Sequence, residues 1–275
     1  MIPSDQPHLR VTAKSHPGKV RDHNEDSYGV TAHRLEHDGR PSVLAIVADG
    51  IGGHQAGEVA SAITVDTIFS LVEATDGEDP QRILGSAVVE AAKRVHQAAS
   101  QDEARKGMGS TVAIAWVLGS QLYTTYVGDS RIYLRHDGIL RQTSVDHTWI
   151  QEALEHDVIQ PDEVAGHPNA HVLRRHIGGE KPPEPDFRLR MSEDETAEQS
   201  VANQGLSLHP GDQILLCTDG LTDLLDLEDI DSALLEHGSE ATTSLVWVAL
   251  QRGGHDNVTV VVMEVPQDPR PSSSA

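Results

Sequence analysis

Cysteine, aromatic residues, basic residues and long hydrophobic runs are all scarce in this sequence. Its 275 residues include a single cysteine, Cys217, so no disulfide can form within the chain. No apolar run approaches the ~20 residues of a membrane-spanning helix, and residues 1–10 lack the apolar stretch of a secretory signal. These absences exclude a disulfide-built fold and predict a cytoplasmic protein without a membrane partner.

Basic residues are outnumbered, since 21 Lys and Arg stand against 43 Asp and Glu, for a formal net charge of −22. Nucleic-acid binding needs a basic surface, so this balance predicts no nucleic-acid partner. Aromatic residues make up 3% of the chain, so the core has to be built from Ala, Val, Ile and Leu. The acidic excess either keeps the protein soluble through self-repulsion or gathers carboxylates around cations, and composition alone favours neither.

Short apolar runs predict a series of β-strands. They cover residues 42–48, 111–118, 121–127, 131–135, 139–142, 212–217 and 258–265. The turns Gly119-Ser120 and Asp137-Gly138 are short enough to join neighbouring strands as hairpins. Tight turns connect antiparallel strands, so the pattern favours antiparallel sheets over a doubly wound parallel sheet.

Helical periodicity is clearest at residues 57–72 and 80–100, with a third segment at about 243–252. The first two adjoin each other, which suggests a helix pair on one face of a sheet. Residues 147–206 are polar and rich in His, Pro and Glu, and predict loops and short helices. The polar, proline-containing residues 1–10 and 266–275 predict flexible ends.

Three aspartates lie beside apolar strands that are far apart in the sequence. Asp49 and Asp219 each follow an apolar run and precede a glycine, while Asp256 comes just before the last strand. If their strands share one sheet edge, these carboxylates meet, and oxygen ligands suit Mg²⁺ or Mn²⁺. The alternative is that Asp-Gly only marks turns. The glycine-rich run that begins at Asp49 argues against a simple turn, because glycine allows the backbone to approach a ligand closely.

Further charged residues lie upstream and in the middle of the chain. Arg21 offers a planar fork that matches phosphate oxygens, and Glu25 and Asp26 add carboxylates close to it. A solvated charge run is the alternative interpretation of this stretch. Asp129 ends another apolar strand with an acid.

These residues belong to a longer series of short motifs in a fixed order. The series runs Arg21…Asn24-Glu25-Asp26, Asp49-Gly50-x-Gly52-Gly53-His54…Gly57-Glu58-x-Ala60-Ser61, Gly107-Met108-Gly109-Ser110-Thr111, Gly128-Asp129-Ser130-Arg131, Asp146-His147, Cys217-Thr218-Asp219-Gly220-Leu221-Thr222-Asp223 and Asp256-Asn257-Val258-Thr259. Each motif is short. Together, between about residues 11 and 265, they resemble the bacterial members of the protein phosphatase 2C family, which are metal-dependent serine/threonine phosphatases.

The resemblance implies an α+β fold, a central sandwich of two antiparallel β-sheets flanked by helix pairs (α-β-β-α). It implies one phosphatase domain over residues 11–265, with a flap at about residues 147–180 beside the site. The implied reaction is hydrolysis of phosphoserine and phosphothreonine on proteins. The implied substrates are a serine/threonine kinase and its targets.

The resemblance also assigns a role to each charged residue above. It implies a centre of two or three Mg²⁺ or Mn²⁺ ions, which lower the pKa of a shared water and orient it toward phosphorus. Arg21 is expected to bind the substrate phosphate. The implied metal-binding residues are Asp49, which bridges two ions, the Gly50 carbonyl, Asp219, Asp256, Glu25 through a water, Asp26 in support of the others, and Asp129 at a third ion. Of these, Asp49, Asp219 and Asp256 are expected to be catalytic.

The sequence does not identify the group that protonates the leaving serine or threonine oxygen. Some family members carry a histidine directly after the first Asp-Gly, but Ile51 occupies that position here. His54 is a weaker candidate than a water near Asp129. We interpret Cys217 as a small buried hydrophobe, because it lies in an apolar run and Asp223, not an arginine, follows six positions later.

Two alternative functions stay open on the sequence alone. The same carboxylates would serve a metal-dependent phosphoesterase that acts on small phosphoesters, although the sequence has no Gly-x4-Gly-Lys nucleotide loop. A non-catalytic interaction module on the same fold is expected to have lost one of the metal-binding acids. All of those acids are present.

Overall fold

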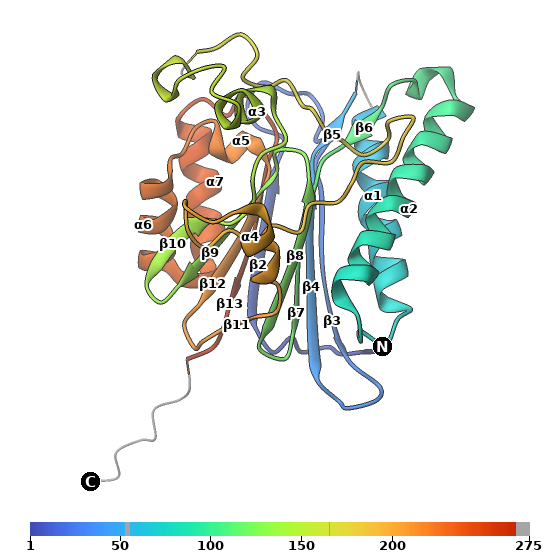
Figure 1. The fold of residues 1–275 in the computed structure, drawn as a ribbon, viewed down its shortest axis with the longest axis vertical. Helices are drawn as coiled ribbons and strands as arrows, with labels where there is room; N and C mark the ends of the chain where they lie inside the picture. The colour runs from blue at the N-terminus through green and yellow to red at the C-terminus, as the bar shows by residue number, and fades with distance from the viewer. Residues whose placement is uncertain (53–55, 165, 268–275) are drawn as a thin grey trace.

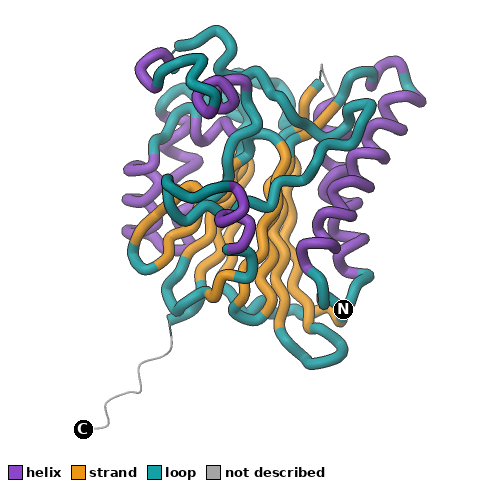
Figure 2. The backbone as a smooth tube through the Cα atoms, in the orientation of Figure 1, coloured by secondary structure: helices purple, strands orange, loops and turns teal. Residues whose placement is uncertain are grey.

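Two antiparallel β-sheets pack face to face, and helices cover the outer face of each (Figure 1). The computed structural model describes residues 1–52, 56–164 and 166–267. Figure 2 shows the layers by secondary structure, with the strands in the middle and the longer helices at the two sides. This architecture confirms the predicted α+β sandwich flanked by helix pairs.

The two sheets interleave along the chain, and their strands pair antiparallel throughout. The first sheet has the order β1 (Ile2–Pro3), β3 (Ser27–Arg34), β4 (Pro41–Ala48), β7 (Val112–Leu118), β8 (Gln121–Val127) and β11 (Leu206–Ser207). The second has the order β10 (Ile139–Gln142), β9 (Arg131–His136), β12 (Gln213–Cys217), β13 (Val258–Glu264) and β2 (Arg10–His16). A short ladder joins β5 (Gly50–Ile51) to β6 (Gly109–Ser110).

Each sheet carries its own helix pair. The long helices α1 (Ala56–Glu73) and α2 (Pro80–Gln101) cover the first sheet, and α6 (Leu227–His237) and α7 (Ala241–Gln251) cover the second (Figure 1). Shorter helices are α3 (Trp149–Glu155), α4 (Ala197–Ala202) and α5 (Asp219–Thr222). Pro80 begins α2, where its missing N–H costs nothing, and the Asp79 side chain accepts from the backbone N–H of Arg82.

The hydrophobic core has three layers, which explains why the central strands are apolar at every position. Along β4, Leu44 and Ile46 pack toward α1 and α2, whereas Val43 and Val47 pack between the sheets. Successive side chains of a strand point to opposite faces, so a strand covered on both faces needs no polar positions. Cys217 of β12 is buried in the third layer, beneath α6 and α7, and burial raises its pKa to about 12. This confirms its interpretation as a buried hydrophobe.

The structure also departs from the sequence-based expectations in places. Residues 1–10 were expected to be flexible, yet β1 pairs with β3, placing Ile2 opposite Arg34. Strands β2 and β3 were missed because most of their residues are only partly buried, so their sequences are polar. Of the expected C-terminal tail, residues 268–275 lie outside the described part of the chain. Among the described helices, none combines the length and apolarity that a bilayer-spanning segment requires.

Candidate metal centre

One end of the sandwich collects acidic residues from both sheets. Asp49 directly follows β4 of the first sheet, and Asp219 begins α5, which follows β12 of the second. Asp256 lies two residues before β13. Because Cys217 of β12 faces Val260 of β13 in an antiparallel pair, Asp219 and Asp256 emerge at the same sheet edge. In Figure 1 this end carries β5 and α5.

These acids line a cavity of about 610 Å³. The lining includes nearly all the residues that the sequence selected, namely Arg21, Glu25, Asp49, Gly50, Asp129, Asp219 and Asp256. Asp26, the remaining one, lies beneath the cavity and is buried. The structure therefore brings together residues that are up to 235 positions apart in the sequence.

Asn257 fixes the loop that carries Arg21 and Glu25. Its side-chain Nδ2 donates to the carbonyls of Pro17 at 3.0 Å and His23 at 2.9 Å, and its Oδ1 accepts from the backbone N–H of Glu25 at 2.7 Å. A single buried amide thus ties the loop before β3 to the start of β13. The loop is therefore positioned by the strand next to Asp256.

Two glycines keep space for backbone oxygens at the cavity wall. A β-carbon at Gly57, in the first turn of α1, would lie 2.7 Å from the carbonyl oxygen of Gly50 and 2.9 Å from Cδ of Glu25. A β-carbon at Gly220 would collide with the carbonyl oxygen of Asn257. Gly57 therefore leaves room for the Gly50 carbonyl and the Glu25 carboxylate, both expected on the metal side.

The buried carboxylates oppose one another electrostatically. Burial raises the pKa of Asp49 well above its usual range, and the neighbouring carboxylates of Asp219 and Asp26 raise it further. Burial likewise raises the pKa of Asp219. Burial and then Asp219 raise the pKa of Asp129 to about 8. Ionised together at neutral pH, these acids destabilise the fold unless cations balance them.

The donor chemistry of the cavity fits divalent cations. Among the described residues, Oδ1 of Asp219 is buried and has no hydrogen-bond partner. A buried polar atom of this kind calls for an unseen partner, and an ion is one such partner. Carboxylate and carbonyl oxygens are the ligands that Mg²⁺ and Mn²⁺ prefer. The carboxylates also repel one another, and bound cations would remove this repulsion. Both observations favour divalent cations in the cavity.

Asp26 supports the centre from below. Its Oδ2 accepts hydrogen bonds from the hydroxyls of Thr218 at 2.9 Å and Thr259 at 2.6 Å, which belong to the ends of β12 and β13. Burial raises the pKa of Asp26 to about 7, and the two hydroxyls lower it in part. Asp26 therefore joins the chain segments that lead to Asp219 and Asp256, and its support of a metal centre stays a prediction.

Several cavity residues were not assigned a role from the sequence, and Asp223, His171 and His255 are the titratable ones among them. Asp223 follows Asp219 by one helical turn, and burial raises its pKa to about 6. The spacing of four between the two aspartates in the motif is the signal that could have placed Asp223 on the same helix face. His171, from the expected flap, lies with Nδ1 3.7 Å from Oδ2 of Asp223. No periodic pattern surrounds His171, so nothing in the sequence pointed to it.

The protonating group stays unassigned among the sequence candidates. Ile51 lines the cavity and carries no titratable group. His54 lies outside the described residues. Besides His171, His255 brings a second imidazole to the cavity wall. The described part of the flap segment contains α3 and a bridge between Thr148 and Leu173.

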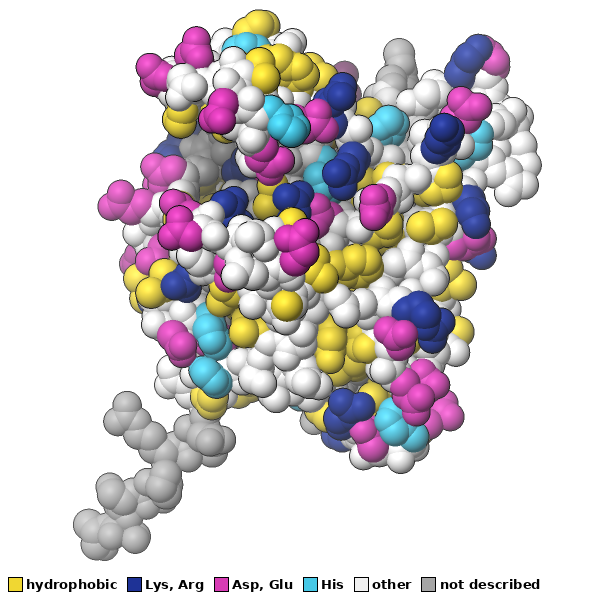
Figure 3. All heavy atoms as spheres, viewed as in Figure 1, with side chains coloured by type: hydrophobic (Ala, Val, Ile, Leu, Met, Phe, Trp, Pro, Cys, Tyr) yellow, Lys and Arg dark blue, Asp and Glu magenta, His cyan; other side chains and the backbone are white. Residues whose placement is uncertain are grey.

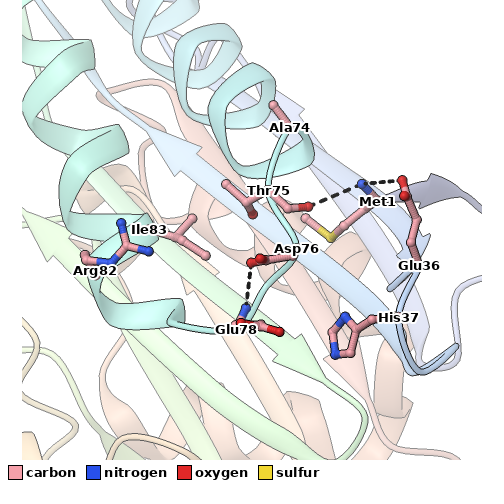
Figure 4. A pocket seen from close by; sticks show the side chains of 9 residues that line it. All are labelled: Met1, Glu36, His37, Ala74, Thr75, Asp76, Glu78, Arg82 and Ile83. Atoms are coloured by element: carbon pink, nitrogen blue, oxygen red, sulfur yellow. Dashed lines mark hydrogen bonds and ion pairs between the residues drawn. The ribbon is translucent and has the colours of Figure 1, made fainter.

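A second cavity, of about 690 Å³, lies at the opposite end of the first sheet, between the β3–β4 turn and the α1–α2 connection. Figure 4 shows the Met1 amino group between Glu36 and Thr75 at this cavity. The Met1 amino group lies 3.5 Å from the Glu36 carboxylate and donates to the carbonyl of Thr75, while Asp76 accepts from the backbone N–H of Glu78. We therefore place the chemistry at the acidic cavity, despite its slightly smaller volume.

A sandwich of two antiparallel sheets between helix pairs carries, at one end, a carboxylate-lined cavity suited to divalent cations. The sequence model of protein phosphatase 2C matches residues 18–245. The chain belongs to this family.

Named relatives agree with this membership. The serine/threonine protein phosphatase PstP of Mycobacterium tuberculosis is 34% identical over 258 residues, which cover 94% of this chain and 45% of PstP. The chain therefore spans a little under half the length of that relative. The serine/threonine phosphatase stp of Listeria monocytogenes is 32% identical over 253 residues, covering 90% of this chain and 92% of stp.

Solved structures agree as well. The crystal structure of M. tuberculosis PstP superposes with a TM-score of 0.78 at 33% identity, covering 94% of this chain and 99% of that one. The PstP catalytic domain in complex with two manganese ions gives a TM-score of 0.76 at 33% identity with the same coverage. These matches confirm the predicted family and fold.

Proposed function

We propose that this chain hydrolyses phosphoserine and phosphothreonine esters on proteins at a centre of two or three Mg²⁺ or Mn²⁺ ions. The observation that carries the proposal is the convergence of Asp49, Asp219 and Asp256 in one cavity, with a buried carboxylate oxygen of Asp219 left unpaired. The two manganese ions of the related PstP catalytic domain support the same assignment. Asp49, the Gly50 carbonyl, Asp219 and Asp256 would hold two ions, and Asp129 a third.

When bound, such ions supply an activated water nucleophile and offset charge on the phosphoryl oxygens. The residues of the chain do the remaining work. Arg21, at the cavity mouth, binds the phosphoryl oxygens through its planar fork. Glu25 accepts hydrogen bonds from water in the cavity and so orients it. Asp26 holds the two strand ends that carry Asp219 and Asp256.

The proposed substrates are phosphorylated proteins, including a serine/threonine kinase and its targets. Arg21 and Asp256 of the cavity lining are both solvent-accessible, which supports access for a phosphorylated side chain on a large partner. The proposal includes a cytoplasmic location, which the single unpaired cysteine, Cys217, favours.

The test is hydrolysis of a phosphothreonine peptide, a phosphotyrosine peptide and a panel of small phosphoesters, each with Mn²⁺, with Mg²⁺ and with excess chelator. We expect turnover of phosphothreonine with either cation and none in chelator. Activity that persists in chelator contradicts the metal-dependent mechanism. Faster turnover of small phosphoesters than of phosphopeptides favours the phosphoesterase instead.

A matched pair of variants completes the test. Asp49→Ala removes the residue expected to bridge two ions, so we expect it to fold and to lose activity. Asp66→Asn changes an exposed aspartate on α1 and is expected to keep full activity. Comparable rates for both variants contradict the assigned centre. If both variants keep the wild-type activity, these carboxylates have a non-catalytic role.

A further inference from the structure

A second group of metal-ligating side chains lies at the other end of β9 from the acidic cavity. Asp129 lines the cavity just before β9, and His136 is the last residue of that strand. Six strand residues span about 17 Å, so the two places are well separated. Beside His136 lie Asp137, from the β9–β10 turn, and His209, from the connection between β11 and β12. Figure 3 shows histidine side chains together at this end of the molecule.

We propose that His136, Asp137 and His209 form a binding site for a transition-metal cation of the zinc class, separate from the acidic cavity. Each residue offers one ligand atom, and these atoms lie within 4.8 Å of one another. Nδ1 of His209 is 3.1 Å from Oδ1 of Asp137, and Nε2 of His136 is 3.5 Å from its Oδ2. Tetrahedral zinc with bonds of ~2.0–2.1 Å needs ligand atoms about 3.3 Å apart, so the observed separations bracket the required one.

Asp212 orients both histidines for this purpose. Its Oδ2 lies 2.6 Å from Nδ1 of His136 and accepts from the backbone N–H of His209 at 2.7 Å. A carboxylate only accepts hydrogen bonds, so Nδ1 of His136 donates to Asp212, and Nε2 is the ring atom left to bind an ion. A histidine ligand backed by a carboxylate in this way is the arrangement that protein zinc sites use.

The base of the site is buried and its top is open. The side chains of Asp212 and His136 are 6% and 11% exposed, whereas those of His209 and Asp137 are 57% and 69% exposed. The two imidazole rings stack with their centroids 4.8 Å apart, which keeps both on the same side. An ion would therefore have three protein ligands and one position open to water.

The backbone and the neighbouring charges favour a cation. Asp137 has a φ of +51°, a left-handed conformation that aspartate tolerates and that turns the residue at the hairpin tip. Arg135 points to the opposite face of β9, where its guanidinium pairs with Asp231 of α6 at 3.0 Å. That positive charge is thus directed away from the histidines. Imidazole ligands favour zinc-class ions over the Mg²⁺ or Mn²⁺ expected at the all-oxygen centre.

The site would join two parts of the chain that are 72 positions apart, the β9–β10 turn and the β11–β12 connection. In the cation-free protein, the same groups are held by the hydrogen bonds described above. An ion would replace the proton shared by His209 and Asp137. It would hold the two side chains together more strongly than the hydrogen bond does. Its role would be to stabilise this end of the sandwich.

The test measures zinc binding by the full chain against a chromogenic zinc chelator, with Mg²⁺ in excess to occupy the oxygen ligands of the acidic cavity. We expect one zinc ion per chain at this site, in the wild type and equally in Asp49→Ala. His209→Ala removes an exposed ligand and is expected to weaken this binding at least about 100-fold, the upper end of what loss of a supporting partner costs. Asp137→Asn keeps the backbone conformation and is expected to weaken it as well.

The control is His237→Ala, which removes an exposed histidine that also lies beside an acid, Glu236, at 3.8 Å. We expect this control to bind zinc as the wild type does. Zinc should raise the melting temperature of the wild type and of His237→Ala but not of His209→Ala. The phosphatase kcat/KM of His209→Ala with Mg²⁺ should match the wild type. Equal zinc affinity in wild type and His209→Ala overturns the proposal, as does zinc binding that disappears in Asp49→Ala.

Discussion

The guanidinium of Arg21 donates a hydrogen bond of 2.6 Å to Oδ2 of Asp256 at the mouth of the acidic cavity. The two side chains are 52% and 35% exposed, so the pair lies where a substrate would enter. It joins a residue expected to bind phosphate to one expected to bind a metal ion. Phosphate at Arg21 and a cation at Asp256 would each replace one half of this pair, so their binding is expected to be mutually favourable.

Replacing Arg21 tests the phosphate-binding role. We expect Arg21→Ala to lower kcat/KM on a phosphothreonine peptide about 10- to 150-fold, which corresponds to the ~1.5–3 kcal/mol of a hydrogen bond to a charged group. Arg21→Lys should recover only part of the loss, because a lysine cannot bind two phosphate oxygens through a planar fork. Arg10→Ala, which removes another exposed, ion-paired arginine, should change nothing. Equal effects of Arg21→Ala and Arg10→Ala would argue against the role.

Neutralising Asp219 should separate stability from activity. In chelator, we expect Asp219→Asn to raise the free energy of unfolding by about 1–3 kcal/mol, because it removes a buried charge that repels Asp256. The same variant should have no measurable phosphatase activity with Mn²⁺. Thermal unfolding and peptide hydrolysis measure the two effects, with Asp66→Asn as the control. A variant that is both less stable in chelator and active contradicts the electrostatic account.

The pH dependence of stability without cations follows from the raised carboxyl pKa values. The pKa of Asp26 is raised to about 7 and that of Asp129 to about 8, whereas an unfolded carboxyl titrates near ~4. Between about pH 4 and pH 8 the folded protein therefore holds more protons than the unfolded chain. The free energy of unfolding falls as the pH rises through this range.

We therefore expect a lower melting temperature at about pH 9 than at about pH 5 in chelator. Saturating Mn²⁺ should reverse this trend, because the ions bind the ionised carboxylates. Asp129→Asn should reduce the slope measured in chelator, and Asp66→Asn should leave it unchanged. A melting temperature in chelator that rises from pH 5 to pH 9 would show that these carboxyls are not held protonated by the fold.

Gly57 offers a case in which helix propensity and packing make opposite predictions. Propensity alone favours alanine over glycine inside a helix by about 1 kcal/mol. A β-carbon here, however, would press on the Gly50 carbonyl and the Glu25 carboxylate. We expect Gly57→Ala to lower both stability and activity, with an overpacking cost of about 1–3 kcal/mol.

Gly85 in α2 is the matched helical control for Gly57. Its β-carbon would meet only the ring of Phe187, at 3.2 Å, and that side chain can shift. Gly85→Ala should therefore keep full activity and near-wild-type stability. Thermal unfolding and kinetics on the same peptide measure both variants. Retention of full activity by Gly57→Ala would contradict the close approach at the cavity wall.

His171 lines the acidic cavity, with Nδ1 3.7 Å from Oδ2 of Asp223, and is a candidate for the unassigned protonation step. If it delivers the proton to the leaving oxygen, His171→Ala should lower kcat about 100-fold or more while the melting temperature stays the same. The kcat on nitrophenyl phosphate should stay unchanged, because its leaving group, nitrophenolate, needs no proton. His255→Ala, at another part of the cavity wall, is the control. A uniform loss on both kinds of substrate would assign His171 to binding instead.

The elements that the sequence predicted well are those with strong local patterns. Strand β4 is apolar throughout because both of its faces are buried, and α2 shows clear helical spacing. Strands β2 and β3 were missed because their exposure leaves a weak pattern. At the site, Asp49, Asp129, Asp219 and Asp256 each lie next to a predicted strand, whereas Glu25 and Asp26, which precede the missed β3, came from the ordered motifs alone.

Contacts between distant segments were beyond sequence reasoning. The pairing of Arg21 with Asp256 depends on the path of a loop, and the approach of His171 to Asp223 depends on how the flap segment folds back. The group at His136 and His209 has a similar origin, because the antiparallel register of β9 and β12 brings the two turns together. No local pattern in the sequence encodes such a register.

The anchoring of the Arg21 loop by Asn257 has a consequence for protein synthesis. The loop before β3 is made early, but the amide that holds it and the strand that pairs with β2 come from residues 257–264. The chain is made from its N-terminus and a domain generally folds as a unit, so this domain cannot fold completely before these residues exist. Until they emerge from the ribosome, Asp256 is missing and Arg21 is unanchored. The acidic cavity would therefore be incomplete until residues 256–264 have been made, and only then could it bind metal ions and phosphate.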